Sequence, residues 1–187
     1  MKPILKDFPD QIETERLLLR CPQPGDGAAF QAAVNASTER LGEWFSWAHG
    51  LTMTLEQGEI NARHFQQQFL KRVDLVSYIF LRGTKTLIGN IVLDDMDWNI
   101  PKFEIGFWLR TGFEGVGYAT EAVTAVTQFA LSTLGARRVW AEIDARNNKS
   151  IAVVQRCGFV HEATLRRNDR CHLSGEPTDL MIWTLTE

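Results

Sequence analysis

The chain has 187 residues, 44% of them hydrophobic and 23% charged, which is enough for one domain with a sizeable apolar core and too few for two. Its 20 basic and 23 acidic residues give a net charge of -3, so no overall basic field is present and we expect no nucleic-acid partner. No apolar run could span a bilayer, and Pro3 and Pro9 interrupt the place where a signal peptide needs its apolar core. We therefore expect a cytoplasmic protein with no membrane partner.

The 3 cysteines of the chain are widely spaced and include no CxxC pair. They are Cys21, Cys157 and Cys171. Together with the histidines they show no metal-ligand spacing, so we expect reduced thiols and no metal.

A short strand and a helix are predicted first. Residues 16–21 form an apolar strand that ends at Pro22, because proline cannot donate to a strand ladder. Asp26 is placed to cap a helix that continues to about Asn35. The apolar spacing gives this helix a buried side made of Phe30, Ala33 and Val34.

Two further helical segments follow. Residues 39–48 predict a short helix or helical loop that carries three large aromatic residues, Trp44, Phe45 and Trp47. For each of these, packing in the core is favoured over lining a cavity, since aromatic side chains dominate core energetics. The spacing at 54–57 is that of a capping box, which opens a longer helix to about Arg72.

A β-hairpin is predicted next. Residues 75–81 and 87–93 have the composition of strands, and the turn at 82–86 contains glycine. Three carboxylates come after the second strand, Asp94, Asp95 and Asp97. A solvated strand edge is favoured here over a metal site, because consecutive side chains on a strand point to opposite faces.

The middle of the chain predicts an anion-binding turn. A strand over 103–110 runs through the glycine-rich segment 111–117 into a helix that starts at Tyr118 and ends near Gly135. Such a turn gathers unpaired amides at a helix N-terminus, where the helix dipole favours a phosphate. An ordinary strand-to-helix turn is the alternative. The sequence does not continue past Gly117 with the Lys and Ser or Thr of a nucleoside-triphosphate loop, and the turn lies too late in the chain for a typical dinucleotide fold.

The last part of the chain predicts three strands and one helix. A strand over 137–144 should run parallel to the strand before the glycine-rich turn, because a helix connects the two. Asn147 is placed to cap the next helix, which ends at Gly158. Residues 159–165 and 180–185 then predict a closing antiparallel pair.

These motifs together resemble the GCN5-related N-acetyltransferase (GNAT) superfamily. Residues 114–119 are similar to its Gln/Arg-x-x-Gly-x-Gly/Ala loop, and residues 104–109 to its central strand. Asn147 to Ser150 and Arg156 to Phe159 are similar to its Asn-x-x-Ser helix and Gly-Phe strand. Residues 14–20 and 161–166 resemble segments of the RimJ/RimL-like ribosomal-protein branch. Two positions depart from the pattern: Glu114 replaces Gln or Arg, and Ala163 replaces a common Gly.

The resemblance implies an α/β fold with a mixed, mostly antiparallel sheet flanked by helices. A parallel, splayed strand pair would form the acetyl-CoA site. The domain would span residues 14–187, after an N-terminal extension over 1–13. Backbone groups of Phe107, Trp108 and Leu109 would hold pantetheine and polarise the carbonyl. The amides of Gly112, Gly115, Val116, Gly117, Tyr118 and Ala119 would hold the pyrophosphate. Asn147 would position pantetheine, with helix capping as its alternative role.

Two side chains are candidates for proton transfer. Glu104 is the first choice as general base, because burial on an apolar strand would raise its pKa; a glutamate at a strand edge in an ion pair is the alternative. Ser150 is the next candidate, as proton donor to the departing sulfur. Val154 stands where many family members have an acidic tyrosine, so that mechanism is not expected, and Cys157 is interpreted as a core thiol rather than a nucleophile.

The function predicted from the sequence is direct transfer of acetyl from acetyl-CoA to a primary amine in a ternary complex. A protein N-terminal amine is the first acceptor to consider. The alternatives are a small-molecule acceptor (an amino acid, a polyamine or an antibiotic), a non-catalytic acetyl-CoA-binding module and, more distantly, a dinucleotide oxidoreductase. Both a monomer and a homodimer are compatible with the sequence.

Overall fold

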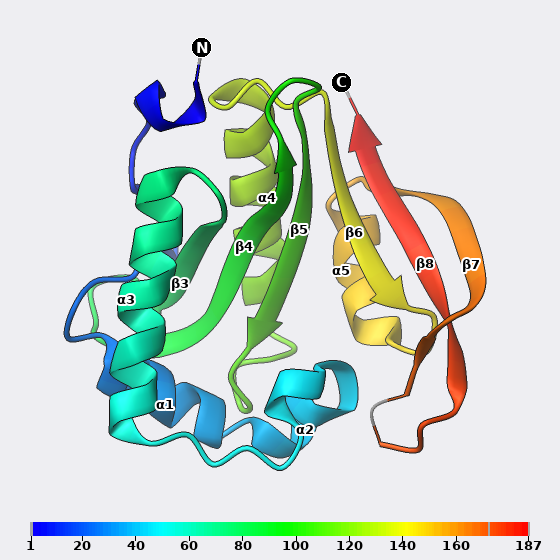
Figure 1. The fold of residues 1–187 in the computed structure, drawn as a ribbon, viewed down its shortest axis with the longest axis horizontal. Helices are drawn as coiled ribbons and strands as arrows, with labels where there is room; N and C mark the ends of the chain where they lie inside the picture. The colour runs from blue at the N-terminus through cyan, green and yellow to red at the C-terminus, as the bar shows by residue number, and fades with distance from the viewer. Residues whose placement is uncertain (1, 172, 187) are drawn as a thin grey trace.

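An eight-stranded sheet forms the framework of the molecule, in the order β1-β2-β3-β4-β5-β6-β8-β7 (Figure 1). The computed structural model describes residues 2–171 and 173–186. The strands are β1 (Gln11–Glu13), β2 (Leu17–Arg20), β3 (Leu75–Leu81), β4 (Leu87–Asp97), β5 (Lys102–Leu109), β6 (Arg138–Asp144), β7 (Val160–Arg170) and β8 (Pro177–Thr186). Every neighbouring pair is antiparallel except β5–β6, as predicted. Strand β1 is part of the sheet, although its residues were predicted to belong to an N-terminal extension over 1–13.

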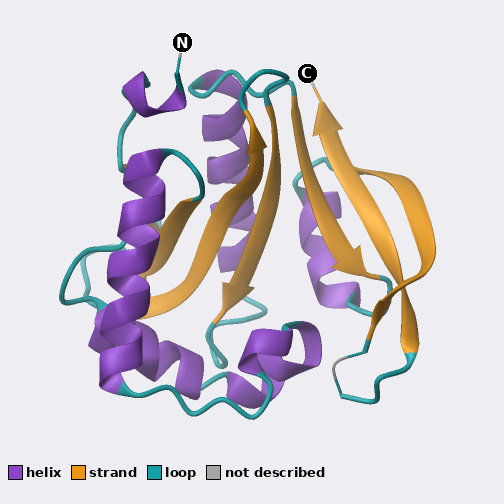
Figure 2. Cartoon of the chain, in the orientation of Figure 1, coloured by secondary structure: helices purple, strands orange, loops and turns teal. Residues whose placement is uncertain are grey.

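Helices cover both faces of the sheet (Figure 2). They are α1 (Gly27–Asn35), α2 (Thr38–Trp44), α3 (Leu55–Lys71), α4 (Tyr118–Ser132) and α5 (Asn148–Arg156), with short 3-10 turns η1 (Pro3–Leu5) and η2 (Ser46–Ala48). One core lies between the sheet and α4 and α5, around Ile91, Phe103 and Val126. A second core, around Phe30, Tyr78 and Trp108, lies under α1 and α3. None of the described helices is both long enough and apolar enough to cross a membrane.

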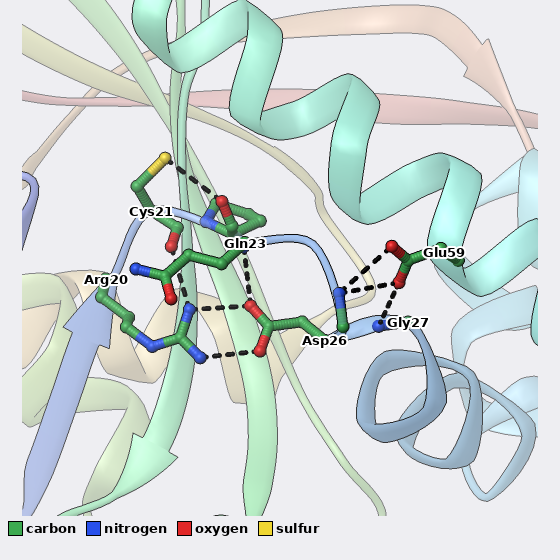
Figure 3. Close-up of polar contacts among 8 residues, drawn as sticks. Arg20, Cys21, Gln23, Asp26, Gly27 and Glu59 are labelled. Atoms are coloured by element: carbon green, nitrogen blue, oxygen red, sulfur yellow. Dashed lines mark hydrogen bonds and ion pairs between the residues drawn. The ribbon is translucent and has the colours of Figure 1, made fainter.

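The start of α1 is held by α3 and not by its own cap. Asp26 is the N-cap residue of α1, as predicted, but its side chain makes no capping hydrogen bond, because its carboxylate pairs with the guanidinium of Arg20 at 2.7 Å (Figure 3). Glu59 of α3 accepts hydrogen bonds from the amides of Gly25 and Gly27 instead. By contrast, the capping box predicted at the start of α3 is present.

The parallel pair β5–β6 is joined only at its beginning. Residues 102–104 pair with residues 138–140, and no later ladder pair joins the two strands within the described parts of the chain. Figure 1 shows the two strands separating toward their C-terminal ends. The predicted splay is therefore present, and it leaves backbone groups of both strands facing a gap.

Candidate active site

A cavity of about 710 Å³ lies where β5 and β6 separate. Its floor comes from β3, β4, β5 and β6, and its walls come from α1, α3, the segment around α2, and the first turn of α5. Residues that face it include Asp74, Asn90, Asp94, Glu104, Gly106, Phe107, Trp108, Glu142, Asn147 and Ser150. The sequence therefore identified Glu104, Phe107, Trp108, Asn147 and Ser150 as part of one site, while Asp74, Asn90 and Glu142 were missed.

The glycine-rich turn after β5 has the backbone that an anion site needs. Gly112, Gly115 and Gly117 have φ values of 93°, 80° and 92°, in the left-handed region that side chains disfavour. Gly117 is the N-cap of α4. No acceptor within the described residues is bonded to the amides of residues 115–119, so these donors are free at the positive end of the helix dipole. The turn thus fits a pyrophosphate.

Glu114 does not leave an unbalanced negative charge beside this turn. Its carboxylate lies 3.2 Å from the ammonium of Lys149 on α5 and 3.6 Å from the guanidinium of Arg40 on α2. Glu114, which departs from the family pattern, therefore holds one cation from α5 and one from α2 close to the turn. Lys149 also precedes Ser150, which faces the cavity, so the turn and the cavity are neighbours.

Arg16 is a residue of this region that the sequence did not single out. Its guanidinium donates to the carbonyl of Val116 at 3.0 Å, pairs with Glu121 at 2.6 Å and lies 4.7 Å from the ring centre of Tyr118. These contacts fix the start of α4 against the segment before β2. The motif at residues 14–20 contains Arg16, but the sequence predicted only a strand there and no role for this side chain.

Glu104 faces the cavity from the position where β5 and β6 begin to separate. Burial raises the pKa of this carboxyl to about 7, and the carboxylates of Asp94, Glu142 and Asp95 contribute to the same rise. The expected direction of the shift is therefore present. The alternative, an edge glutamate in an ion pair, is wrong, because β5 lies between β4 and β6 and no described cation pairs with Glu104.

Asp94 corrects the interpretation of the acidic segment as a solvated edge. It belongs to β4 and lies directly opposite Glu104 in the antiparallel register. Burial first, then the negative charge of Asp74, raises the pKa of Asp94 to about 6. Its Oδ1 is buried with no hydrogen-bond partner among the described residues. Strand β4 continues to Asp97, beyond the predicted end, and this extension carries Asp94 into the cavity.

The first turn of α5 forms part of the cavity wall. The Oδ1 of Asn147 accepts a hydrogen bond from the amide of Ser150 at 3.1 Å, which is the capping role given as its alternative. Both side chains still line the cavity. Leu109 is not among the lining residues; it pairs with Gly89, whose lack of a side chain lets the two strands approach. Val154 is fully buried in the core, with no hydroxyl to offer as an acid.

The aromatic residues of the α2–η2 segment line the cavity. The expectation of core packing is confirmed for Phe45, which also packs against the core around Phe30 and Trp108, but not for Trp44 and Trp47, which belong to neither core. Trp44, Phe45 and Trp47 all face it, and Trp47 is 46% exposed. Helix α2 and the turn η2 are too short to bury three large rings on one side, and Phe45 lies between them. They form a wall opposite the sheet.

No cysteine is among the described residues that line the cavity. All three are unpaired in the structure. Cys157 contacts the hydroxyl of Thr124 at 3.4 Å, and burial raises the pKa of its thiol, which opposes nucleophilic use. None of the described residues forms a group of three or more His, Cys, Asp and Glu side chains that could hold a metal ion.

Comparison with known proteins gives the family. Residues 16–160 match the family model described as "Acetyltransferase (GNAT) domain". The chain belongs to this family. As a GNAT protein it is an N-acetyltransferase, and its curated relatives carry such names. "Putative ribosomal N-acetyltransferase YdaF" of Bacillus subtilis (strain 168) is 28% identical over 171 residues, 91% of each chain. The spermidine N(1)-acetyltransferase of Vibrio cholerae is 21% identical over 150 residues, 80% of this chain and 82% of that protein.

Solved structures of GNAT proteins share the fold at low sequence identity. The microcin C7 self-immunity acetyltransferase MccE, in complex with acetyl-CoA and AMP, superposes with a TM-score of 0.85 at 19% identity, covering 96% of this chain and 98% of that one. RimL, the ribosomal L7/L12 alpha-N-protein acetyltransferase, in complex with coenzyme A, has a TM-score of 0.84 at 18% identity, covering 94% and 97%. The RimL-like GNAT architecture expected from the sequence is thus confirmed.

Proposed function

We propose that this GNAT protein transfers the acetyl group of acetyl-CoA directly to a primary amine, with both substrates bound at once. The observation that carries the proposal is that Glu104 of β5 faces the gap between β5 and β6, while the glycine-rich turn follows the other end of the same strand. A donor held at one end of β5 can thus deliver its thioester beside a base at the other. Such positioning accounts for a large part of the rate of group-transfer enzymes.

The residues suited to hold the donor come from several elements. The free amides of residues 115–119 and the N-terminus of α4 would bind the pyrophosphate, with Arg16, Arg40 and Lys149 adding positive charge nearby. Backbone groups at Phe107 and Trp108 border the gap, where pantetheine would lie and a backbone N–H could polarise the thioester carbonyl. The complexes of MccE and RimL with acetyl-CoA and coenzyme A support this choice of donor.

In the proposed reaction, Glu104 and Ser150 each transfer one proton. An amine arrives as an ammonium ion, and the carboxylate of Glu104 removes one proton, for which a pKa of about 7 is suitable. The amine nitrogen then forms a bond to the carbonyl carbon while the carbon–sulfur bond breaks. The departing sulfur takes the remaining surplus proton of the nitrogen, with Ser150 as the group to relay it. The products are the amide, coenzyme A as thiol, and one proton that Glu104 returns to water.

The acceptor is first assigned as the N-terminal amine of a protein. This assignment is supported by the similarity to YdaF, whose name specifies a ribosomal N-acetyltransferase, and to the fold of RimL. A small-molecule amine is the second candidate, because the cavity of about 710 Å³ has the size of a small-molecule site.

Release of free thiol and formation of the acetylated amine test the proposal together. Purified protein is mixed with acetyl-CoA and a panel of small amines and peptides with Ser, Ala and Met at the N-terminus, and products are identified by mass. We expect thiol release that depends on an amine and matches the product formed. Tight binding of acetyl-CoA by calorimetry with no amine-dependent thiol release would instead indicate a non-catalytic binding module.

A further inference from the structure

The glycine-rich turn, residues 111–117, has little backbone structure of its own to hold it in shape. One hydrogen bond of 3.0 Å runs from the amide of Phe113 to the carbonyl of Arg110, and another of 3.0 Å runs from the amide of Glu121 to the carbonyl of Gly117, where α4 begins. The turn also contains three glycines with positive φ. Glycine loses more backbone freedom on ordering than any other residue, so this turn is costly to fix in one conformation. Side chains from other elements can supply that order in advance.

Ser37 holds the beginning of the turn from the junction of α1 and α2. Its hydroxyl accepts a hydrogen bond from the amide of Thr111 at 2.9 Å and donates one to the carbonyl of Ala33 at 2.9 Å. Ser37 is the N-cap residue of α2, yet its side chain makes no capping hydrogen bond to that helix. The residue is 2% exposed. A buried hydroxyl that bonds a segment 74 residues away, and not its own helix, indicates a role at the turn.

Arg16 holds the end of the turn. Its guanidinium donates to the carbonyl of Val116 at 3.0 Å and, through Nε, to the carboxylate of Glu121 at 2.7 Å. A Cβ on Gly117 would lie 3.3 Å from its Nη2, so the guanidinium packs against the N-cap of α4. The hydroxyl of Thr14 donates to Glu121 at 2.6 Å. Arg16 therefore connects a carbonyl of the turn to the first turn of α4, and it balances a carboxylate that would otherwise repel an anion there.

We propose that Ser37 and Arg16 are positioning residues that keep the glycine-rich turn in its anion-binding conformation before the donor arrives. The inference rests on the proposed function, because it takes acetyl-CoA as the ligand of this turn. Neither Ser37 nor Arg16 is among the described residues that line the cavity, so neither is placed to touch the reacting atoms. A preordered site binds its ligand more tightly, since less ordering remains to be done on binding. Loss of either contact should weaken donor binding and leave the chemical step unchanged.

Two conservative substitutions test the contacts. Ser37→Ala removes the hydroxyl, and Arg16→Lys keeps the positive charge but removes the planar fork. We expect each to raise the Kd of coenzyme A, measured by calorimetry, by about five- to tenfold, the usual net effect of losing a hydrogen bond. The KM of acetyl-CoA should rise by a similar factor. The kcat and the KM of the amine should stay within about twofold of the wild-type values.

Thr38→Ala and Arg63→Lys are the matched controls. Thr38 follows Ser37 in the chain, but its hydroxyl donates to the carbonyl of Val34 at 3.2 Å and not to the turn. Arg63 pairs with Glu59 of the same helix, α3, at 2.7 Å. Both controls should leave the Kd of coenzyme A within about twofold of the wild-type value, as surface or local contacts far from a ligand do.

Hydrogen exchange in the ligand-free protein measures the order of the turn directly. The amides of Phe113 and Glu121 make the hydrogen bonds at the two ends of the turn. They should exchange faster in Ser37→Ala and Arg16→Lys than in the wild type, whereas the amides of α3 should exchange at the wild-type rate. Faster exchange throughout the chain would indicate general destabilisation and overturn the positioning role.

The outcomes separate this inference from the proposed function. A wild-type protein that binds no coenzyme A would contradict the proposed donor itself. Coenzyme A binding with the wild-type Kd in both variants would overturn the positioning role and leave acetyl transfer intact. A Kd that is unchanged in Arg16→Lys but raised in Arg16→Gln would assign Arg16 to charge alone and overturn its part of the proposal. If Ser37→Ala does not fold, Arg16→Lys, at a side chain that is 42% exposed, still decides the question.

Discussion

At the scale of single residues, the site contains two largely buried carboxyl groups, Glu104 and Asp94, that form no ion pair with any described cation. Glu104 and Asp94 have pKa values raised to about 7 and about 6, and burial is the first cause for both. Glu121 shows the contrast, because Arg16 and Thr14 hold its pKa below the ordinary value despite partial burial. A buried carboxylate with a raised pKa and no ion-pair partner is typical of a functional site.

Glu104→Gln should lower kcat by about 10²- to 10³-fold, because the amine loses its general base. In the wild type, kcat/KM should rise with pH through about 7 as Glu104 loses its proton, and the variant should lack this step. Glu162→Gln is the control, since Glu162 is a glutamate on edge strand β7 paired with Arg138. Initial rates between pH 5.5 and 9 provide the measurement; an unchanged rate in the Glu104→Gln protein would remove Glu104 from the mechanism.

The same two carboxyls make stability depend on pH. Folding raises their pKa values above the ordinary 4.5 and 3.8, so their contribution is full at pH values below these and is lost as pH rises through about 6 and 7. From pH 5 to pH 8 we expect the free energy of unfolding to fall by roughly 1–2 kcal/mol from this source, a figure reduced for partial solvent screening. Urea unfolding of the wild type and of the double variant Glu104→Gln/Asp94→Asn gives the difference. Equal pH slopes for both proteins would contradict the assignment.

At the scale of elements, the cavity wall depends on a close helix crossing. Gly27 of α1 and Gly58 of α3 face one another, and a Cβ on Gly58 would lie 2.4 Å from the carbonyl oxygen of Gly27. Helix α1 contributes Phe30 to the cavity lining, and α3 contributes Phe65. The two glycines therefore set how close these rings come to the sheet.

Gly58→Ala should destabilise the fold by about 1–3 kcal/mol through overpacking, although alanine is the better helix former by about 1 kcal/mol. Gln67→Ala, at a more accessible position of the same helix, should change stability by less than about 0.5 kcal/mol. Urea unfolding midpoints compare the two variants. A Gly58→Ala protein as stable as the wild type would mean that the helices separate at little cost.

At the scale of the whole molecule, the splayed pair divides the sheet into two parts. Strands β1 to β5 and strands β6 to β8 meet through the ladder at residues 102–104 and 138–140 and through the core under α4 and α5. A donor bound in the gap would contact both parts. Binding to the folded state alone stabilises it in proportion to the logarithm of ligand concentration.

Coenzyme A at 100 times its Kd should add about 2.7 kcal/mol to stability, which corresponds to a rise in Tm of about 5–10 °C for a domain of this size. Gly117→Asp should abolish the rise, because it adds bulk and negative charge at the N-terminus of α4. Gly135→Asp is its control: that glycine also has a positive φ, of 74°, and open space around it, but lies beyond the other end of α4. Thermal unfolding with and without coenzyme A measures both. A full shift in the Gly117→Asp protein would contradict the phosphate site.

Local patterns predicted much of this protein correctly. Three of the correct predictions depend on residues close in sequence: the glycines of the turn, the capping box of α3 and the β3–β4 hairpin. The fourth, the parallel pair β5–β6, depends on the chirality rule for crossover connections. The order of the motifs along the chain indicated the family. Among side chains, Glu104 was identified because a carboxylate inside an apolar strand is unusual.

The remaining features depend on partners distant in the sequence, which a local pattern does not contain. The side chain of Asp26 pairs with Arg20 and not with the amides of its own helix, and the α2–η2 aromatics line a cavity because the sheet opposite them is open. Asp94 became part of the site only through the register of β4 against β5. The sequence by itself determined the elements and the chemistry of the turn. The tertiary structure alone brought Asp94 beside Glu104, because strand register, a property of pairing between strands, selects which side chains share a face.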